Sequence, residues 1–151
     1  MPTHFTGTRA EMRTLDTFIK LTRCTNSLQT RLADRDTIGN LTWSQFAVLE
    51  VLYHLGHMTQ GEIANKVLKS GSNMTTVIDN LERDGLVRRE RDADDRRVVR
   101  VHLTEAGRGR IEVVLPGHIA ALVEEFKVLS AGEQETLGKL CKKLGRGRKS
   151  E

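Results

Sequence analysis

The stretch "SGSNMTTVIDNLERDGLVRRERDADDRRVVRVHLTEAG", Ser70 to Gly107, decides the fold of this chain. Its first part carries apolar residues at helical spacing, and its last part carries apolar residues that alternate as in a strand. Between them lie six arginines, from Arg88 to Arg100, interrupted by four acidic residues. Arginine is costly to bury, so a cluster of this density is either a solvated surface or a surface that contacts a negatively charged partner.

The first part of the stretch predicts a helix from about Asn73 to Asp84 that ends at Gly85. A turn of about 100° per residue places four apolar side chains on one side, the pattern of a core face: Met74, Val77, Ile78 and Leu81. The other side is polar and mostly short: Ser72, Thr76, Asp79 and Arg83, with Asn73 and Thr75 near the edges. Hydroxyl and amide groups at the start of a helix can bond phosphate oxygens or base edges of DNA.

This polar face predicts a surface that reads DNA, with the candidate contacts Ser70, Ser72, Asn73, Thr75, Thr76 and Arg83. The alternative is that Ser70 and Ser72 only cap the helix. Asp79 is unfavourable beside phosphate, so we expect it to pair with an arginine, either Arg83 or one from the segment that follows.

The second part predicts a two-stranded hairpin, "LVRRER" (86–91) and "RVVRVHL" (97–103), closed by the acidic turn "DADD" (92–95). An arginine at the tip of such a turn can enter a narrow minor groove, where the potential is most negative. Aspartates there can fold the turn and hold a neighbouring guanidinium in a fixed orientation. The alternative is a solvated hairpin, although exposed ion pairs contribute only about 0–1 kcal/mol each to stability. The candidate DNA contacts are Arg88, Asp95, Arg96 and Arg97.

The flanking sequence is helical. A long amphipathic helix is expected over 9–35. Two capping pairs, Thr42 with Gln45 and Thr59 with Glu62, predict the starts of two further helices. Thr104 begins a long helix that should kink or break at Pro116. Ser130 with Glu133 opens a last helix with an apolar stripe: Leu137, Leu140, Cys141 and Leu144. Three short helices followed by a strand pair is the order of a winged helix-turn-helix. The apolar stripes of the terminal helices need a partner, and a second copy of the chain is the simplest one.

Composition narrows the class of partner. The 151 residues carry a formal net charge of +4, which favours a polyanion as partner. Only 4% of the residues are aromatic, too few to favour binding of single-stranded nucleic acid, whose bases stack on aromatic side chains. Double-stranded DNA is therefore the expected polyanion. No run of about 18 apolar residues and no signal-peptide core occur, and Cys24 and Cys141 form no metal-type pair, so we expect a cytoplasmic protein with reduced thiols. No nucleophile–base pair, glycine-rich phosphate loop or zinc spacing is present, and the interpretation is a protein that is not an enzyme and needs no cofactor.

From Thr42 to Gly107 the chain resembles the MarR (multiple antibiotic resistance regulator) family of bacterial transcription factors. The resemblance rests on "LTWSQFAVL", "GEIANKV", "SGSNMTTVIDNLERDGLVRR" and "DADDRRVVRVHLTEAG". It implies one mainly α-helical domain over 1–151 with a β-hairpin wing, in which 9–35 and 104–145 supply dimerisation helices. Residues 42–103 would form the DNA-binding lobe and 146–151 a basic tail.

The resemblance also implies a homodimer that regulates transcription, with the recognition helix from Ser70 to Arg83 in the major groove. The wing residues Asp95, Arg96 and Arg97 would contact the minor groove and backbone, and either of the two arginines would be the inserting residue. The sequence departs from the family pattern at Ala93, where a proline is common, and at Pro116.

Similar regulators are often repressors released by a small phenolic or aromatic acid, and Trp43 and Phe46 are candidates to line its pocket, or else ordinary core aromatics. A rival prediction is redox sensing through Cys24, beside Arg23, although the family's sensing cysteine would fall nearer Phe18. Glu50, His54 and His57 have spacings that suit a metal on a helix face, but such histidines are more often incidental. A winged-helix module that binds an acidic protein is the remaining alternative, and the short polar groups of the recognition helix argue against it.

Overall fold

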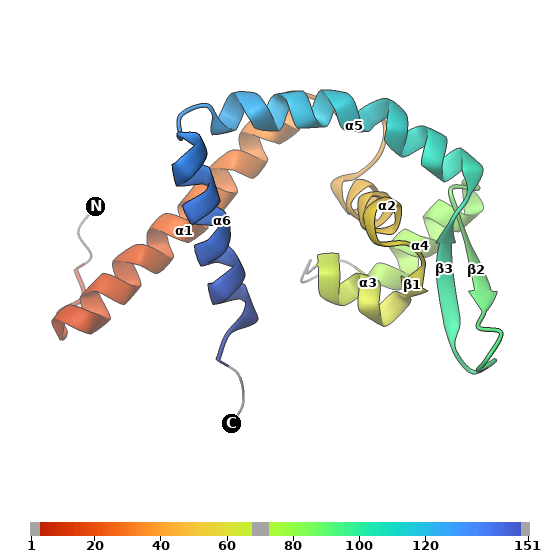
Figure 1. The fold of residues 1–151 in the computed structure, drawn as a ribbon, viewed down its shortest axis with the longest axis horizontal. Helices are drawn as coiled ribbons and strands as arrows, with labels where there is room; N and C mark the ends of the chain where they lie inside the picture. Colours follow the sequence, from red (N-terminus) through yellow and green to blue (C-terminus); the bar gives the residue numbers. More distant parts are fainter. Residues whose placement is uncertain (1–3, 68–72, 149–151) are drawn as a thin grey trace. The chain divides into compact units, whose positions relative to one another are not determined.

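The computed structural model describes residues 4–67 and 73–148. In chain order these form α1 (Arg9–Asp34), α2 (Trp43–Leu55), β1 (Met58–Thr59), α3 (Gln60–Val67), α4 (Met74–Arg83), β2 (Val87–Arg91), β3 (Val99–Leu103), α5 (Glu105–Phe126) and α6 (Ala131–Arg146) (Figure 1). The predicted class, mainly α with a small β wing, is confirmed. Contacts divide the chain into two compact units, residues 1–36 with 120–151 and residues 37–119.

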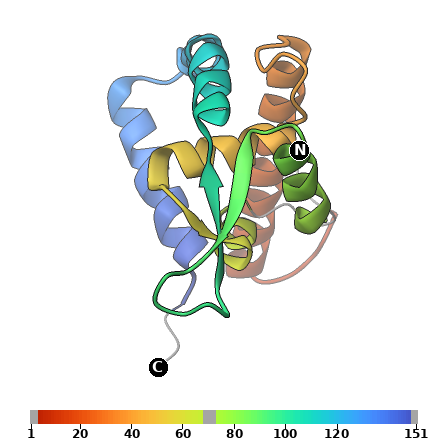
Figure 2. The ribbon, with the colours of Figure 1, turned by 90° about the vertical axis from the view of Figure 1, so that its right-hand side faces the viewer.

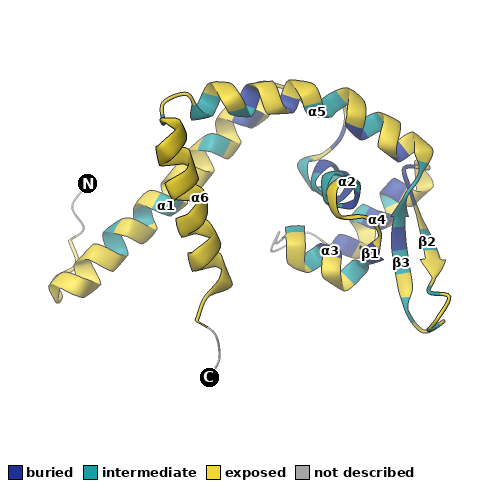
Figure 3. Cartoon of the chain, in the orientation of Figure 1, coloured by how far each residue is buried: buried dark blue, intermediate teal, exposed yellow. Residues whose placement is uncertain are grey.

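The first unit contains α1, α6 and the C-terminal end of α5. Glu125, near the end of α5, accepts hydrogen bonds from Arg31 Nε at 2.6 Å and Arg35 Nη2 at 2.7 Å, which ties it to the last turns of α1. The predicted capping pair of Ser130 and Glu133 is present at the start of α6. Much of the apolar surface of this unit is exposed rather than packed (Figure 3), as in the stripe of α6.

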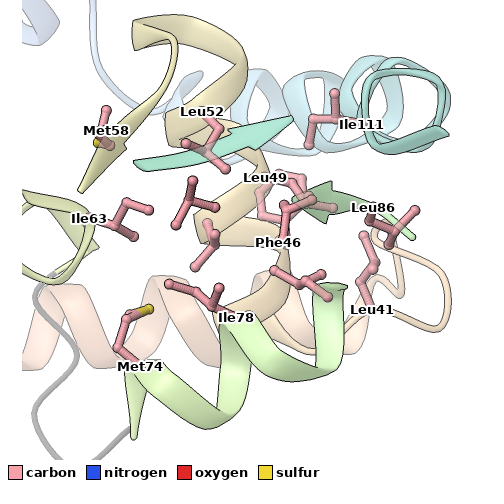
Figure 4. Close-up of a cluster of buried hydrophobic side chains, with 14 of the residues drawn as sticks. Leu41, Phe46, Leu49, Leu52, Met58, Ile63, Met74, Ile78, Leu86 and Ile111 are labelled. Atoms are coloured by element: carbon pink, nitrogen blue, oxygen red, sulfur yellow. The ribbon is translucent and has the colours of Figure 1, made fainter. Parts of the chain in front are cut away.

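The second unit is built around α2. Thr42 and Gln45 form the predicted capping box, and the helix ends at Gly56, whose φ of 82° suits glycine. Phe46 and Leu49 of α2 pack against Ile78 of α4 and Ile111 of α5 in one core (Figure 4). The predicted core face of α4 is confirmed, with Met74, Ile78 and Leu81 buried.

The sheet has three antiparallel strands in the order β1-β3-β2, so the predicted two-stranded hairpin was incomplete. The additional strand pairs Met58 with Val101 and Thr59 with Arg100. A two-residue strand is too short for apolar alternation to reveal it, and its position depends on a distant partner rather than on its own sequence. The hairpin itself has Arg89 opposite Val101, with Val101 buried.

The start of α5 is fastened to the turn between α4 and β2. The Thr104 hydroxyl donates to the Gly85 carbonyl at 2.6 Å and accepts from the Gly107 N–H at 3.0 Å. Of the kink or break predicted at Pro116, the break is wrong, because α5 is one helix that contains this proline. Proline removes a single backbone hydrogen bond, and Ile111 and His118, both buried, are fixed on either side of it.

Candidate nucleic-acid interface

The polar face of α4 is in place from Asn73 onward, whereas Ser70 and Ser72 lie outside the described residues. Asn73 is the N-cap, and its Oδ1 accepts a hydrogen bond from the Thr76 N–H at 3.4 Å. Gln60, the first residue of α3, donates from Nε2 to the Thr75 hydroxyl at 2.6 Å. Asn73 therefore caps the helix, a role that the sequence suggested for Ser70 and Ser72. Thr75 and Thr76 are exposed.

Asp79 has the arginine partner that was expected, and it comes from the hairpin. Arg89 Nη2 lies 2.7 Å from Asp79 Oδ1, and Arg89 Nη1 lies 3.1 Å from Glu82 Oε1. The Arg89 backbone N–H also donates to Glu82 Oε2 at 2.8 Å. The alternative partner, Arg83, instead lies 3.6 Å from the carboxylate of its neighbour Asp84.

The acidic turn of the hairpin is organised by Asp92. Its Oδ1 accepts from the N–H groups of Asp94 at 2.8 Å and Asp95 at 3.3 Å, and its Oδ2 accepts from Arg100 Nε at 2.7 Å. The Arg100 hydrogen bond, helped by the two backbone N–H groups, lowers the pKa of the Asp92 carboxyl to about 2. Both predicted uses of an aspartate here, folding the turn and holding a guanidinium, are combined in one side chain.

The tip of the hairpin presents Arg97. Its Nε and Nη2 donate to the two carboxylate oxygens of Asp95 at 3.0 and 3.1 Å, and the side chain is 90% exposed. The same pairing lowers the pKa of Asp95 and raises that of Arg97. Arg91 Nη1 donates to the backbone carbonyl of Arg96 at 2.8 Å, which fixes the chain beside Arg97. Figure 2 shows the turn at the end of the hairpin opposite α5.

The six arginines therefore do not form one uniform surface. Arg89 and Arg100 are largely covered and hold carboxylates of other elements or of the turn. Arg88, which pairs with Glu90 at 2.7 Å, is exposed, as are Arg96 and Arg97. Of the predicted contacts on the hairpin, Arg88, Arg96 and Arg97 are exposed and Asp95 is half-buried.

The proposed effector residues belong to a cluster of three rings. Phe46 is buried and Trp43 is half-buried, with ring centroids 5.8 Å apart. His118 of α5, which the sequence did not single out, lies 4.8 Å from the Phe46 ring and 5.7 Å from the Trp43 ring. It is only 6% exposed, and its Nδ1 has no hydrogen-bond partner among the described residues. Burial lowers the pKa of this histidine.

The rival sites are less developed. Cys24 and Cys141 are both exposed thiols on helices. His54 lies 3.8 Å from Glu50, but His57 stacks on His102, with ring centroids 4.6 Å apart, so the three candidate metal ligands do not converge. Within residues 4–67 and 73–148, no group of three or more histidine, cysteine or acidic side chains is arranged to hold a metal ion. The same part of the chain contains no helix with the length and apolarity to span a membrane.

Comparison with known proteins identifies the family of this chain. The sequence profile of the MarR family matches residues 41–99. The "HTH-type transcriptional regulator MhqR" of Bacillus subtilis is 34% identical over 133 residues, which are 88% of this chain and 92% of MhqR. The chain belongs to the MarR family. It is a transcriptional regulator and not an enzyme, as the sequence predicted.

Solved structures agree with this assignment. A MarR family protein from Bacillus stearothermophilus is 32% identical, with a TM-score of 0.66 over 89% of this chain and 94% of that one. BpsR of Bordetella bronchiseptica, whose DNA binding is regulated by 6-hydroxynicotinic acid, shares the fold, with a TM-score of 0.76 over 98% of this chain and all of BpsR at 23% identity.

Sequence reasoning missed Gln60, Glu82 and His118. Each acts through a partner that is far away in the sequence or on another element: Gln60 on Thr75, Glu82 on Arg89, and His118 on the α2 aromatics. The capping signal of Thr59 and Glu62 did place Gln60 at the first position of a helix. Which face of the next helix it would contact depends on the packing of α3 against α4.

Proposed function

We propose that this regulator binds double-stranded operator DNA as a homodimer, with α4 in the major groove and the hairpin as a minor-groove wing. The observation that carries the proposal is the Arg97 guanidinium, fully presented to solvent yet held in a bidentate fork by Asp95. A side chain fixed in this way has already lost its rotational freedom and can enter a groove at little further entropic cost. Arg97, rather than Arg96, is therefore the inserting residue.

The contacts to bases and phosphates divide by side-chain type. Thr75, Thr76 and the amide of Asn73 are short groups that can reach base edges from the first turn of α4, and Ser70 and Ser72 precede them in the chain. Arg83, Arg88 and Arg96 are exposed cations that suit phosphate contacts, and Asp95 acts through Arg97.

Dimerisation is supported by the apolar surface of the terminal helices. Leu137, Leu140 and Leu144 of α6 are exposed, and Met12 and Phe18 are exposed on α1. Exposed apolar stripes of this kind mark an interface, and a second copy would cover them. We assign 9–35 and 104–145 to dimerisation within a single MarR-like domain, 42–103 to DNA binding, and 146–151 to a basic tail, in a cytoplasmic repressor.

Release by a small aromatic acid is supported by the ring cluster. The buried His118 lies beside the rings of Trp43 and Phe46, and its Nδ1 has no hydrogen-bond partner within residues 4–67 and 73–148. An aromatic ring would stack there while its carboxylate accepts a hydrogen bond from the imidazole. The regulation of BpsR by 6-hydroxynicotinic acid is a precedent for this ligand class within the same fold.

A mobility-shift assay against the duplex upstream of the chain's own gene tests DNA binding. Affinity should fall steeply between two salt concentrations, with a log–log slope of about −0.9 per phosphate neutralised. Arg97→Ala should weaken binding to all sequences, whereas Thr76→Ala should change sequence preference. Arg108→Ala removes the same charge from a side chain that lies over the Tyr53 ring, and serves as the matched control. Failure to prefer any duplex over random DNA would refute the proposal.

A further inference from the structure

We propose that Arg89 is a positioning residue, which sets the angle between the recognition helix and the wing without touching DNA itself. This inference rests on the proposed function, because the angle matters only if α4 and the hairpin engage the same duplex. It concerns Asp79, Glu82 and Arg89, of which the sequence suggested only that Asp79 pairs with an arginine.

The geometry is that of a clamp. One guanidinium spans two carboxylates, Asp79 at 2.7 Å and Glu82 at 3.1 Å, which are separated by three residues and so lie on neighbouring turns of α4. Glu82 also accepts the backbone N–H of Arg89 at 2.8 Å. The strand is therefore attached to the helix through both its side chain and its main chain, and rotation of α4 against β2 would break one of these bonds.

The position of Arg89 in β2 allows its side chain to reach the carboxylates of α4. Strand residues alternate between faces, and Arg88 pairs with Glu90 of its own strand rather than with α4. Arg89 is 25% exposed, whereas Arg97 at the tip is 90% exposed. The ion pair of the Arg89 side chain with Asp79 and its hydrogen bond to Glu82 are both directed to the helix. A phosphate would have to compete with two carboxylates that are already in place.

The clamp also removes an electrostatic problem. Asp79 lies on the polar face of α4, where a bare carboxylate would repel the phosphates that flank the major groove. Arg89 pairs with that carboxylate from the side of the wing. The same side chain thus fixes the helix and neutralises a charge that would otherwise oppose binding.

The test compares DNA affinity in the intact regulator and in three variants, Arg89→Met, Asp79→Asn/Glu82→Gln, and the triple variant. Arg89→Met should weaken operator binding about tenfold, in the range typical of coupled neighbours. Asp79→Asn/Glu82→Gln should also weaken it, by about threefold or more, although it removes two negative charges that repel DNA. In the triple variant, loss of Arg89 should add less than about twofold, since the clamp is already absent.

A direct phosphate contact by Arg89 predicts the opposite pattern. Arg89→Met would then cost the same in both backgrounds and would lower the salt slope by about 1, and Asp79→Asn/Glu82→Gln would bind more tightly. Either result would overturn the inference. Arg88→Met is the matched control, because it removes the same charge from the adjacent residue and should cost equally in both backgrounds.

Folding is monitored by thermal unfolding, with binding measured well below each midpoint. If Arg89→Met does not fold, the sign of the Asp79→Asn/Glu82→Gln effect alone decides between the two explanations. If the unaltered protein binds no duplex in preference to random DNA, the proposed function is refuted instead. Failure of the proposed function and failure of the Arg89 inference are therefore distinguishable.

Discussion

Among the glycines that the structure describes, Gly107 should tolerate an added methyl group least, although helix propensity predicts the reverse. A Cβ added there would lie 2.0 Å from the Leu86 carbonyl oxygen and 2.8 Å from Leu103 Cδ1. Leu86 O cannot retreat freely, because it accepts the Thr104 N–H at 3.1 Å. Relieving the clash costs about 1–3 kcal/mol of strain, and losing that hydrogen bond costs about 1 kcal/mol more. Replacing glycine by alanine inside a helix returns about 1 kcal/mol.

The balance predicts that Gly107→Ala lowers the free energy of unfolding by about 1–3 kcal/mol. Gly109→Ala is the control, because it lies one half-turn further along the same helix and its Cβ would meet nothing within 4 Å. That variant should be stabilised by up to about 1 kcal/mol. Urea unfolding at one fixed protein concentration measures both. If the two variants shift the midpoint in the same direction, the close approach of α5 to Leu86 is not as described.

Three further outcomes follow from the site and the terminal helices. Asp95→Ala should weaken operator binding about twofold to tenfold with an unchanged salt slope in mobility shifts, because Arg97 keeps its charge but loses its fixed orientation. Since burial lowers the pKa of His118 below its usual 6.5, the unfolded chain binds more protons just below pH 6.5, and stability should fall as pH drops through that window. His118→Leu should flatten this dependence in unfolding titrations, and an unchanged pH profile would contradict it. Leu140→Glu should give a monomer by sedimentation, because that side chain, 58% exposed in one chain, would carry a charge into the dimer interface.

The features that the sequence predicted well are those with local causes. The capping boxes at Thr42, Thr59 and Ser130 depend on residues three apart, and all three are formed. The core face of α4 and the burial of Val101 follow from helix and strand periodicity alone, whereas Val99 on the same strand is exposed. The pairing of Asp79 with a hairpin arginine was predicted from charge, but charge could not choose Arg89 from its neighbours.

The errors have non-local causes. Strand β1 exists because Met58 meets Val101, a residue 43 positions later, and not because of its own two-residue pattern. The continuity of α5 at Pro116 reflects packing of the residues around the proline, which outweighs the loss of one backbone hydrogen bond. His118 was overlooked because an isolated histidine in a helix carries no sign of its burial; only the fold brings it to Phe46.

The acidic residues of the hairpin raise the question of why a DNA-binding wing should give up positive charge. Glu90, Asp92 and Asp95 each take one arginine: Arg88, Arg100 and Arg97. A guanidinium has five N–H donors, and a carboxylate uses at most two or three of them, so a paired arginine can still bond a phosphate or a base edge. An all-basic hairpin would attract DNA more strongly, but it would attract every sequence equally, because the phosphate term carries no sequence information. Pairing lowers this uniform attraction and fixes where each remaining donor points. The acids should therefore matter more for the ratio of operator to random-DNA affinity than for affinity itself.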